Sequence, residues 1–250
     1  MARAAVLGRL VWRVATVAAV RDETPTARTL VLDVPGWPGH LAGQHVDVRL
    51  TAEDGYSTQR SYSIASAPDG ERLELTVQRI ADGEVSPYLT EVLAPGDPLE
   101  LRGPIGGYFV WRPEDASPVL LVAGGSGIAP LMAMARFRIA SGSPAPMRLV
   151  YSTRAPDTLL YSDELRKLAT LEQGLRVDLV YTRQGPAGWT GPVGRLDASR
   201  LASLAWPPSD APASFVCGPT GFVESVANLL VAQGHDPRRV KTERFGPTGT

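Results

Sequence analysis

Apolar and polar positions alternate over short distances in the first half of the chain, and this pattern predicts β-strands. Segments rich in Val, Leu and Thr recur between clusters of turn-forming residues, such as 34–39 and 67–70. Several short strands at this spacing are typical of a barrel or a sandwich. A short helix is expected at 86–93, with Ser86 as its N-cap and Pro87 at its first position. The predicted strands are 12–20, 29–34, 44–50, 59–64, 73–80 and 98–101.

The second half of the chain alternates apolar, strand-like runs with helical patterns. Such alternation predicts a parallel sheet with helices on both faces. A polar segment bounded by prolines, 112–118, separates the two halves, so we predict a β domain at residues 1–112 and an α/β domain at 113–250. The predicted strands of the second domain are 119–123, 148–151, 176–181, 214–217 and 240–244, and its predicted helices are 128–139, 162–171, 198–204 and 221–232.

Composition excludes several kinds of protein. The 250 residues carry a net charge of −1 without a basic tract, which argues against nucleic-acid binding. The single cysteine, Cys217, allows neither an intramolecular disulfide nor a cysteine-ligated iron–sulfur cluster, and three scattered histidines give no metal site. Residues 1–20 are apolar but are interrupted by Arg9 and Arg13, so we expect no export signal, no membrane span and a cytoplasmic location.

The segment 60–66 is the first candidate for a ligand site. In a strand, Arg60 and Tyr62 would share one face, whereas Ser61 and Ser63 would share the other. The end of such a strand could offer a guanidinium for phosphate, a ring for stacking and a hydroxyl for hydrogen bonding. An ordinary amphipathic edge strand would show the same pattern, so the residues alone leave both interpretations open.

Three further motifs could bind a ligand or serve the fold alone. Gly124-Gly125-Ser126-Gly127-Ile128-Ala129-Pro130 follows a predicted strand and opens a helix, where free N–H groups suit a pyrophosphate, although a tight turn also needs glycine. Cys217-Gly218-Pro219-Thr220-Gly221 should lie at the same edge of the sheet, although a lone cysteine is usually an inert core residue. Gly83-Glu84-Val85-Ser86 could bind phosphate or simply cap a helix.

Taken in order over 12–245, these motifs resemble those of the ferredoxin–NADP⁺ reductase superfamily. The resemblance implies a six-stranded antiparallel β-barrel that binds flavin, followed by a Rossmann-like α/β domain that binds nucleotide. The active site would lie between the two domains, and the C-terminal tail would return to the flavin. The remaining motifs of the match are Ala42-Gly43-Gln44, Gly103-Pro104-Ile105-Gly106 and Glu243-Arg244-Phe245-Gly246.

The resemblance also implies which residues hold the flavin. Within the motif 60–63, which includes Ser61, Arg60 would bind the pyrophosphate, Tyr62 would stack on the isoalloxazine ring, and Ser63 would hydrogen-bond near flavin N5. A complete pyrophosphate site favours FAD over FMN. Val77, Gln78 and Arg79 would line the ribityl and phosphate path, and Gly83, Val85 and Ser86 would complete the pyrophosphate site.

In the second domain the same resemblance assigns a site for NADP or NAD. Cys217, Gly218 and Pro219 would place the nicotinamide, and Phe245 would cover the flavin until the nicotinamide enters. Glu243 would relay a proton or orient the nicotinamide, unless it is a surface carboxylate. The pyrophosphate would lie on Gly125, Ser126, Gly127 and Pro130, and Thr182 and Arg183 after a strand would favour the 2′-phosphate of NADPH over NADH.

The expected function is that of an enzyme, an FAD-dependent oxidoreductase that accepts hydride from NAD(P)H. It would pass single electrons to a separate ferredoxin or other one-electron acceptor protein, with Ser63, Cys217, Glu243 and Phe245 at the reacting centre. Two alternatives stay open at this point. One is a reductase of free flavin, and the other is an electron-transfer subunit without dehydrogenase activity. A monomer without bound metal is expected.

Overall fold

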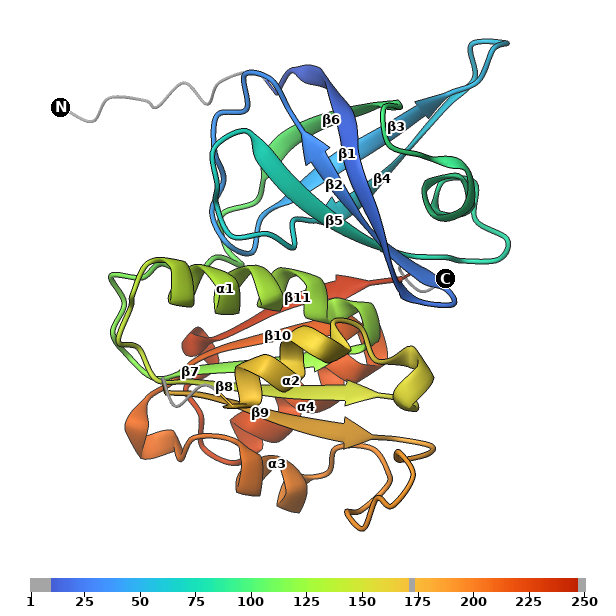
Figure 1. Cartoon of the computed structure of the whole chain (residues 1–250). Coiled ribbons are helices and arrows are strands. Elements are labelled where there is room, and N and C mark those ends of the chain that lie inside the picture. The colour runs from blue at the N-terminus through green and yellow to red at the C-terminus, as the bar shows by residue number, and fades with distance from the viewer. Residues whose placement is uncertain (1–9, 171–173, 247–250) are drawn as a thin grey trace, which may run out of the picture.

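The chain folds into two stacked domains, which the computed structural model describes over residues 10–170 and 174–246 (Figure 1). Residues 1–9, which carry part of the expectation about an apolar N-terminus, lie outside the described residues, as does Leu171 of the predicted helix 162–171. From Trp12 onward the N-terminal segment is a β-strand. None of the helices in the described ranges is long and apolar enough to cross a membrane.

Six antiparallel strands form the first domain and confirm the predicted barrel. Their order is β4-β3-β6-β1-β2-β5, and a bridge between Ile64 and Leu75 joins the two ends of the sheet. Leucine and valine side chains from alternate positions fill the interior, because successive side chains of a strand point to opposite faces. The strands are β1 (Trp12–Thr24), β2 (Ala27–Asp33), β3 (His45–Thr51), β4 (Ser57–Ser63), β5 (Arg72–Gln78) and β6 (Pro98–Ile105).

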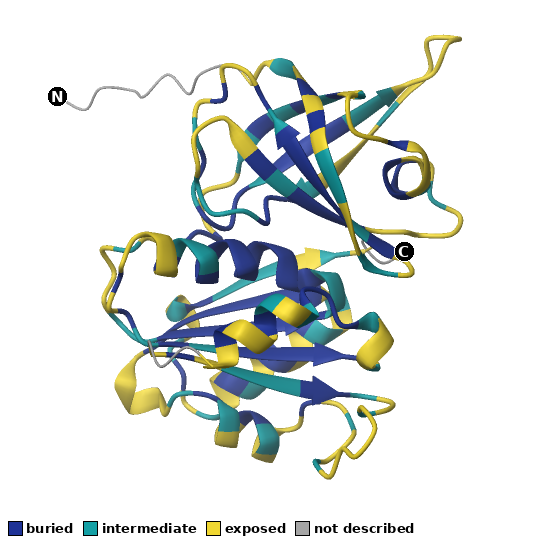
Figure 2. Cartoon of the chain, in the orientation of Figure 1, coloured by how far each residue is buried: buried dark blue, intermediate teal, exposed yellow. Residues whose placement is uncertain are grey.

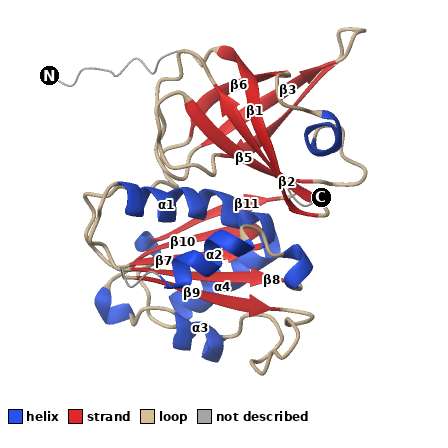
Figure 3. Cartoon of the chain, viewed as in Figure 1, coloured by secondary structure: helices blue, strands red, loops and turns tan. Residues whose placement is uncertain are grey.

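Five parallel strands in the order β11-β10-β7-β8-β9 form the second domain, as predicted. Helices α1 and α2 cover one face of this sheet, and α3 and α4 cover the other (Figure 3). The strands are β7 (Val119–Gly124), β8 (Met147–Thr153), β9 (Leu175–Tyr181), β10 (Ala213–Pro219) and β11 (Val240–Phe245). The helices are α1 (Ile128–Ala140), α2 (Ser162–Thr170), α3 (Ala198–Leu204) and α4 (Thr220–Ala232).

Helix α1 is apolar on nearly all sides because it lies between the sheet and the barrel. All residues from Ile128 to Ala135 are buried, which Figure 2 shows as a dark ribbon facing the barrel. One apolar cluster contains this helix, strands β7 and β8, and Ala42, Ala65 and Trp111 from the barrel side. An all-round apolar helix is expected inside a protein. The two domains therefore share a continuous apolar interface.

The helix expected at 86–93 is present, but its type and its N-terminal cap differ from the prediction. It is a short π-helix, Tyr88–Val92, and its N-terminus has no side-chain cap. The Ser86 hydroxyl instead accepts a hydrogen bond from the Ile80 N–H at 3.0 Å. The capping prediction was wrong because the loop before the helix takes up this hydroxyl.

The domain boundary placed after residue 112 falls between the two sheets. Strand β6 ends at Ile105 and β7 begins at Val119. In this connecting segment Trp111 is almost fully buried and its ring lies edge-on to Phe137 of α1, with ring centroids 6.2 Å apart. The segment is therefore packed against the second domain, and residue 112 stays a proposal for the boundary itself.

Candidate functional site

Strand β4 alternates as the sequence predicts. Arg60 and Tyr62 lie opposite valines of β3 whose side chains fill the barrel, so they belong to the inner face of the sheet. Ser61 and Ser63 belong to the outer face, where the Ser61 hydroxyl donates to Asp47 Oδ1 at 2.7 Å. A contact of the Ser61 side chain with flavin stays a prediction, in which the hydroxyl oxygen would act as the acceptor while its hydrogen is donated to Asp47.

Arg60 carries an exposed guanidinium whose contacts with the chain are local. Its Nη1 donates to the Gln59 carbonyl oxygen at 2.7 Å and to Thr58 Oγ1 at 3.1 Å. Its side chain is 55% exposed, and Nη2 lies 3.5 Å from Glu84 Oε2. Exposed ion pairs of this kind contribute roughly 0–1 kcal/mol. A pyrophosphate accepts shorter and stronger charge-assisted bonds from arginine, so it can displace Glu84. These observations fit the phosphate role that the resemblance implies for Arg60.

Tyr62 provides a neutral aromatic ring beside Arg60. Burial raises the pKa of Tyr62 to about 12, and the charge of Arg60 opposes this rise. The phenol therefore keeps its proton at physiological pH. The ring packs partly against the barrel core. A half-buried ring with a fixed position is suited to stacking on a flat ligand.

The other residues predicted to bind flavin are divided between the core and the surface. Val77 and Val85 are 0% and 1% exposed, so any contact they make with a cofactor comes from backbone atoms. Gln78 is exposed and lines a cavity between the domains. Arg79 Nη1 pairs with Glu91 Oε1 at 2.9 Å, and its side chain is 38% exposed. Gln78 and Arg79 thus present exposed polar side chains, that of Arg79 in an ion pair with Glu91.

The loop that begins at Gly83 is closely packed. A Cβ at Gly83 would lie 3.0 Å from Ser86 Oγ and 3.1 Å from the Ile80 carbonyl oxygen, so a larger residue would open the loop. Ser86 is bound within the same loop. A role of this loop in pyrophosphate binding stays a prediction.

Two glycine turns meet at the carboxyl edge of the second sheet. A Cβ at Gly127 would lie 2.3 Å from the Cys217 carbonyl oxygen, and one at Gly218 would lie 3.0 Å from the Gly124 carbonyl oxygen. Gly125 has a φ of +55°, which favours glycine. The close approach of the two turns therefore requires glycine at these positions. The structure brings together the two turns that the sequence places at one edge.

Helix α1 starts directly after the first of these turns. Pro130 lies in its first turn, where the missing N–H has no intrahelical partner to lose. The free N–H groups of a helix start and its positive dipole end suit a pyrophosphate. The adjoining cavity, of about 220 Å³, lies between the domains, since Gln78 from the barrel lines it together with Gly125, Ser126 and Pro219. The geometry fits a dinucleotide that reaches from the second domain toward the barrel.

Ser63 and Glu243 join the two domains at the same edge of the sheet. The Ser63 hydroxyl donates to Glu243 Oε1 at 3.1 Å, across 180 positions in the sequence. Glu243 lies beside Cys217 in the parallel pair β10–β11. Burial raises the pKa of Glu243 to about 7, and the hydrogen bond from Ser63 opposes the rise. Glu243 is therefore a partly buried carboxyl that holds a proton near neutral pH, and not a surface carboxylate.

Cys217 is fully buried and lies beside Glu243 of the neighbouring strand β11. Burial first, and the charge of Glu243 second, raise the pKa of the Cys217 thiol. A nucleophilic cysteine needs a lowered pKa, so the raised pKa argues against Cys217 as a nucleophile, and its placing of the nicotinamide stays a prediction. Phe245 lies opposite Pro219 in the β10–β11 pair and packs partly against the apolar cluster of α1. Its position at the end of β11 is compatible with the covering role that the resemblance implies.

A second cavity, of about 570 Å³, is lined by three arginines and by no acidic residue. Arg154 and Arg183 follow the ends of β8 and β9, and Arg195 comes from the loop before α3. None of the three forms an ion pair with a carboxylate in the described part of the chain. Thr182 also lines this cavity. The cavity suits a doubly charged phosphate beside the predicted dinucleotide site.

Of the three arginines that line this cavity, the sequence analysis proposed Arg183 and missed Arg154 and Arg195. Arg154 could have been found, because it directly follows a strand of the parallel sheet, and ligands bind beyond the carboxyl ends of such strands. Arg195 carries no comparable signal, since it lies in an irregular loop. Within residues 10–170 and 174–246, no group of three or more His, Cys, Asp or Glu side chains is placed to hold a metal ion.

Comparison with protein families assigns both domains. Residues 15–110 match the oxidoreductase FAD-binding domain, and residues 121–228 match the oxidoreductase NAD-binding domain. The chain thus consists of an FAD-binding domain followed by an NAD-binding domain. The two matches lie on either side of residue 112.

Curated relatives include whole proteins of similar size and larger ones. Ferredoxin–NADP reductase B of Sorangium cellulosum is 35% identical over 241 residues, covering 92% of this chain and 96% of the relative. The glycine betaine monooxygenase reductase subunit of Pseudomonas aeruginosa is 34% identical over 208 residues, covering 82% of this chain. The match spans only 56% of that relative, slightly more than half its length. The ferredoxin reductase component of 3-ketosteroid-9-alpha-monooxygenase from Mycobacterium tuberculosis is 32% identical over 240 residues, which cover 92% of this chain and 64% of the relative.

Solved structures show the same arrangement of domains. The FAD/NAD-binding domain of a nitric oxide dioxygenase from Vibrio cholerae superposes with a TM-score of 0.83 at 26% identity, covering 94% of this chain and 99% of the other. A cytochrome P450 reductase from Amycolatopsis gives a TM-score of 0.82 at 27% identity, covering 98% and 74%. The barrel and the nucleotide domain meet at Ser63 and Glu243, and relatives match the chain along almost its whole length. The chain therefore belongs to the ferredoxin–NADP⁺ reductase superfamily.

Proposed function

We propose that this protein is an enzyme that takes hydride from NADPH onto FAD and delivers single electrons to a separate redox protein. The observation that supports this most directly is the contact between Ser63 of the barrel and Glu243 of the second domain. It lies where the two glycine turns meet, so the site for each cofactor faces the same point. When bound, NADPH would supply a hydride, and FAD would accept its two electrons together and release them one at a time.

The residues of the chain would act by binding and orienting. Arg60 would hold a pyrophosphate, Tyr62 would support the ring, and the turn at Gly127 would admit the dinucleotide backbone. Glu243 would hold a proton at its carboxyl, within hydrogen-bonding distance of the Ser63 hydroxyl. Since both groups lie at the domain boundary, they can also exclude water from the reacting atoms.

The electron acceptor is proposed to be a separate protein, a ferredoxin or the iron–sulfur component of an oxygenase. A [2Fe–2S] cluster needs four protein ligands, and the 250 residues contain one cysteine. The relatives from Pseudomonas and Mycobacterium are named as reductase components of monooxygenases. These names support a one-electron acceptor protein over free flavin as the end point.

Anaerobic stopped-flow reduction of the purified protein tests the proposal. We expect the bound FAD to be bleached rapidly by NADPH and more slowly by NADH, and then to reduce added ferredoxin. Failure of both coenzymes to bleach the flavin would contradict the enzyme assignment. Rapid turnover with added riboflavin but none with ferredoxin would favour a flavin reductase instead.

The arginine-lined cavity makes coenzyme choice a testable point. Arg183→Ala should raise the KM for NADPH about tenfold through the loss of one charge-assisted contact, with little change for NADH. Arg154→Ala should act in the same direction. Arg176→Ala is the matched control, because Arg176 lies on β9 but pairs with Asp178 at 2.8 Å. Equal effects of Arg183→Ala on both coenzymes would contradict a 2′-phosphate site.

The proposed setting is the cytoplasm, where NADPH is produced and consumed. A monomer is proposed because a single chain brings both cofactor sites together at Ser63 and Glu243 without help from a second copy. Cell fractionation tests the location, and light scattering of the purified protein tests the monomer. A stable dimer in solution would contradict the proposed monomer.

A further inference from the structure

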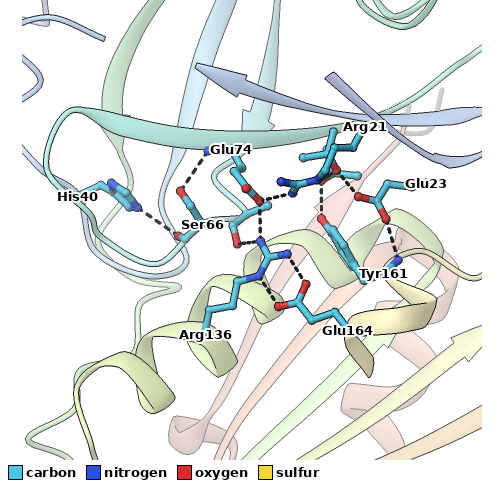
Figure 4. Close-up of polar contacts among 11 residues, drawn as sticks. Arg21, Glu23, His40, Ser66, Glu74, Arg136, Tyr161 and Glu164 are labelled. Atoms are coloured by element: carbon cyan, nitrogen blue, oxygen red, sulfur yellow. Dashed lines mark hydrogen bonds and ion pairs between the residues drawn. The ribbon is translucent and has the colours of Figure 1, made fainter. Parts of the chain in front are cut away.

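A group of polar side chains lies where helix α1 meets the barrel, about 12 Å along the helix from the glycine turn. It consists of Arg136 on α1, Glu164 on α2, Tyr161 before α2 and Glu74 on β5, which we call the interdomain clamp (Figure 4). Glu74 belongs to the barrel and the other three residues belong to the second domain. No cofactor contact described above involves these residues.

Arg136 donates hydrogen bonds to both domains. On the barrel side, Nη1 donates to the Ala65 carbonyl oxygen at 2.8 Å and to Glu74 Oε2 at 3.0 Å. On the other side, Nε and Nη2 donate to the two oxygens of Glu164 at 2.8 and 2.5 Å. The Arg136 side chain is only 16% exposed. Since a planar guanidinium with a two-pronged partner fixes angle as well as distance, Arg136 holds the barrel at a defined orientation to α1 and α2.

Tyr161 adds a second connection beside the first. Its hydroxyl donates to Thr76 Oγ1 of the barrel at 2.5 Å, and its backbone N–H donates to Glu23 Oε2 at 3.0 Å. The Arg136 guanidinium lies 5.1 Å from the centre of the Tyr161 ring. Tyr161 has a φ of +57°, which a large side chain adopts only where its surroundings hold it. The contacts on both sides of Tyr161 are thus specific to this arrangement of the domains.

The interdomain clamp ties together the two segments that carry the cofactor sites. Ala65, which accepts a hydrogen bond from Arg136, comes two residues after Ser63 and three after Tyr62. Helix α1, which carries Arg136, starts directly after the glycine turn at Gly127. A shift of α1 against the barrel would therefore move one cofactor site relative to the other.

We propose that Arg136 is a positioning residue for hydride transfer, because its bonds to Ala65, Glu74 and Glu164 set the distance and angle between the flavin site and the nucleotide site. This inference rests on the proposed function. Arg136 touches neither cofactor site itself. Its effect should therefore fall on the rate of the transfer, not on the affinity for either cofactor.

Loss of the Arg136 side chain should loosen the interface without unfolding either domain. Glu74 keeps an ion pair with Arg21 at 2.9 Å, within the barrel. Glu164 is 35% exposed and can be hydrated once its partner is removed. Each domain also has its own apolar core. Methionine is a suitable replacement because it keeps the length and the apolar stem of arginine.

In the test, Arg136→Met protein with full FAD content is mixed with saturating NADPH under anaerobic conditions. We expect the limiting rate of flavin reduction to fall about tenfold, since small misplacements of reacting groups slow a reaction strongly. The Kd for NADP⁺, the FAD content and the Tm of thermal unfolding should stay close to those of the wild type. Arg136→Lys keeps the charge but loses the planar guanidinium group. Its limiting rate should therefore lie between those of the wild type and Arg136→Met.

Arg21→Met is the matched control, because it removes the other partner of Glu74 but breaks no bond between the domains. Its limiting rate should equal that of the wild type. A wild-type rate in Arg136→Met, or an equal loss in Arg21→Met, would overturn the proposal. A fall confined to Arg136→Met supports it.

A second measurement does not depend on catalysis. Spin labels on cysteines introduced by Glu53→Cys in the barrel and Ala202→Cys on α3 report the distance between the domains; both positions are exposed, whereas the native Cys217 is buried. The distance distribution should broaden in Arg136→Met and stay narrow in Arg21→Met. An unchanged distribution would overturn the clamp. If wild-type flavin were reduced by neither coenzyme, the proposed function would fail, and this distance measurement would still decide whether Arg136 fixes the orientation of the two domains.

Discussion

Replacing Arg60 with alanine is expected to weaken FAD binding about 30- to 150-fold, which corresponds to ~2–3 kcal/mol. The reason is that a pyrophosphate needs charge-assisted donors, and Arg60 on β4 carries an exposed guanidinium whose contact with a carboxylate, that of Glu84, is a long one of 3.5 Å. Equilibrium dialysis of the protein against FAD measures the loss. A variant that keeps its full yellow colour after dilution would contradict the assignment.

Two further variants separate phosphate binding from stability of the barrel. Arg72→Ala removes a similar exposed arginine, 59% exposed and paired with Asp33 at 2.8 Å, from the neighbouring strand β5. It should leave FAD binding unchanged. Glu84→Gln removes the carboxylate that competes for Arg60, so it should strengthen FAD binding about two- to threefold, in line with an exposed pair of less than about 1 kcal/mol. Weaker binding in Glu84→Gln would mean that Glu84 itself supports the cofactor.

The order and type of the strands and long helices could be predicted, because the spacing of apolar and polar residues in each element reflects which of its faces are buried. Strands of the barrel alternate, and the inner strands β7 and β10 of the parallel sheet are buried almost throughout, since helices cover both faces. Helix α1 shows where this reasoning is limited. Its residues Ile128 to Ala135 are buried all round, and nothing in their pattern says that the second partner is the barrel. The pattern of apolar residues along a helix shows that the helix is buried, but it does not show which domain packs against it.

The predicted site shows the same division between local and tertiary information. Alternation along β4 correctly separated Arg60 and Tyr62 from Ser61 and Ser63. Alternation could not show that the partner of Ser63 is Glu243, because Glu243 comes from the other domain. The contact forms only once two segments 180 positions apart meet.

The residues that sequence reasoning missed are arginines whose role depends on their neighbours in space. Arg154 and Arg195 converge on one cavity from two separate loops. Arg136 stands in an apolar helix pattern, where a single charge is usually at the surface; here two carboxylates from different elements surround it. The place of Arg154 directly after β8 is the one signal in the sequence, and the positions of Arg195 and Arg136 give none.

Glu243→Gln is expected to slow the limiting rate of flavin reduction about 100-fold near neutral pH, the scale of a general acid–base contribution. Burial raises the pKa of Glu243 from 4.5 to about 7, so a substantial fraction of the wild-type protein holds a proton there at neutral pH. Reduction adds negative charge at this place, which an ionised carboxylate would oppose. The wild-type rate should therefore fall as the pH rises through about 7, and Glu243→Gln should show no such dependence.

The same group predicts how stability depends on pH. Because its folded pKa is raised, the folded protein binds a proton that the unfolded chain releases near 4.5, so the contribution of Glu243 to stability is lost as the pH rises from 4.5 to about 7. Glutamine cannot ionise, so Tm should fall less between about pH 5 and about pH 8 in Glu243→Gln than in the wild type. Ser63→Ala removes the hydrogen bond that lowers this pKa, and should move the midpoint of the rate profile to higher pH. A midpoint that stays in place in Ser63→Ala, or a pH profile that persists in Glu243→Gln, would show that another group titrates.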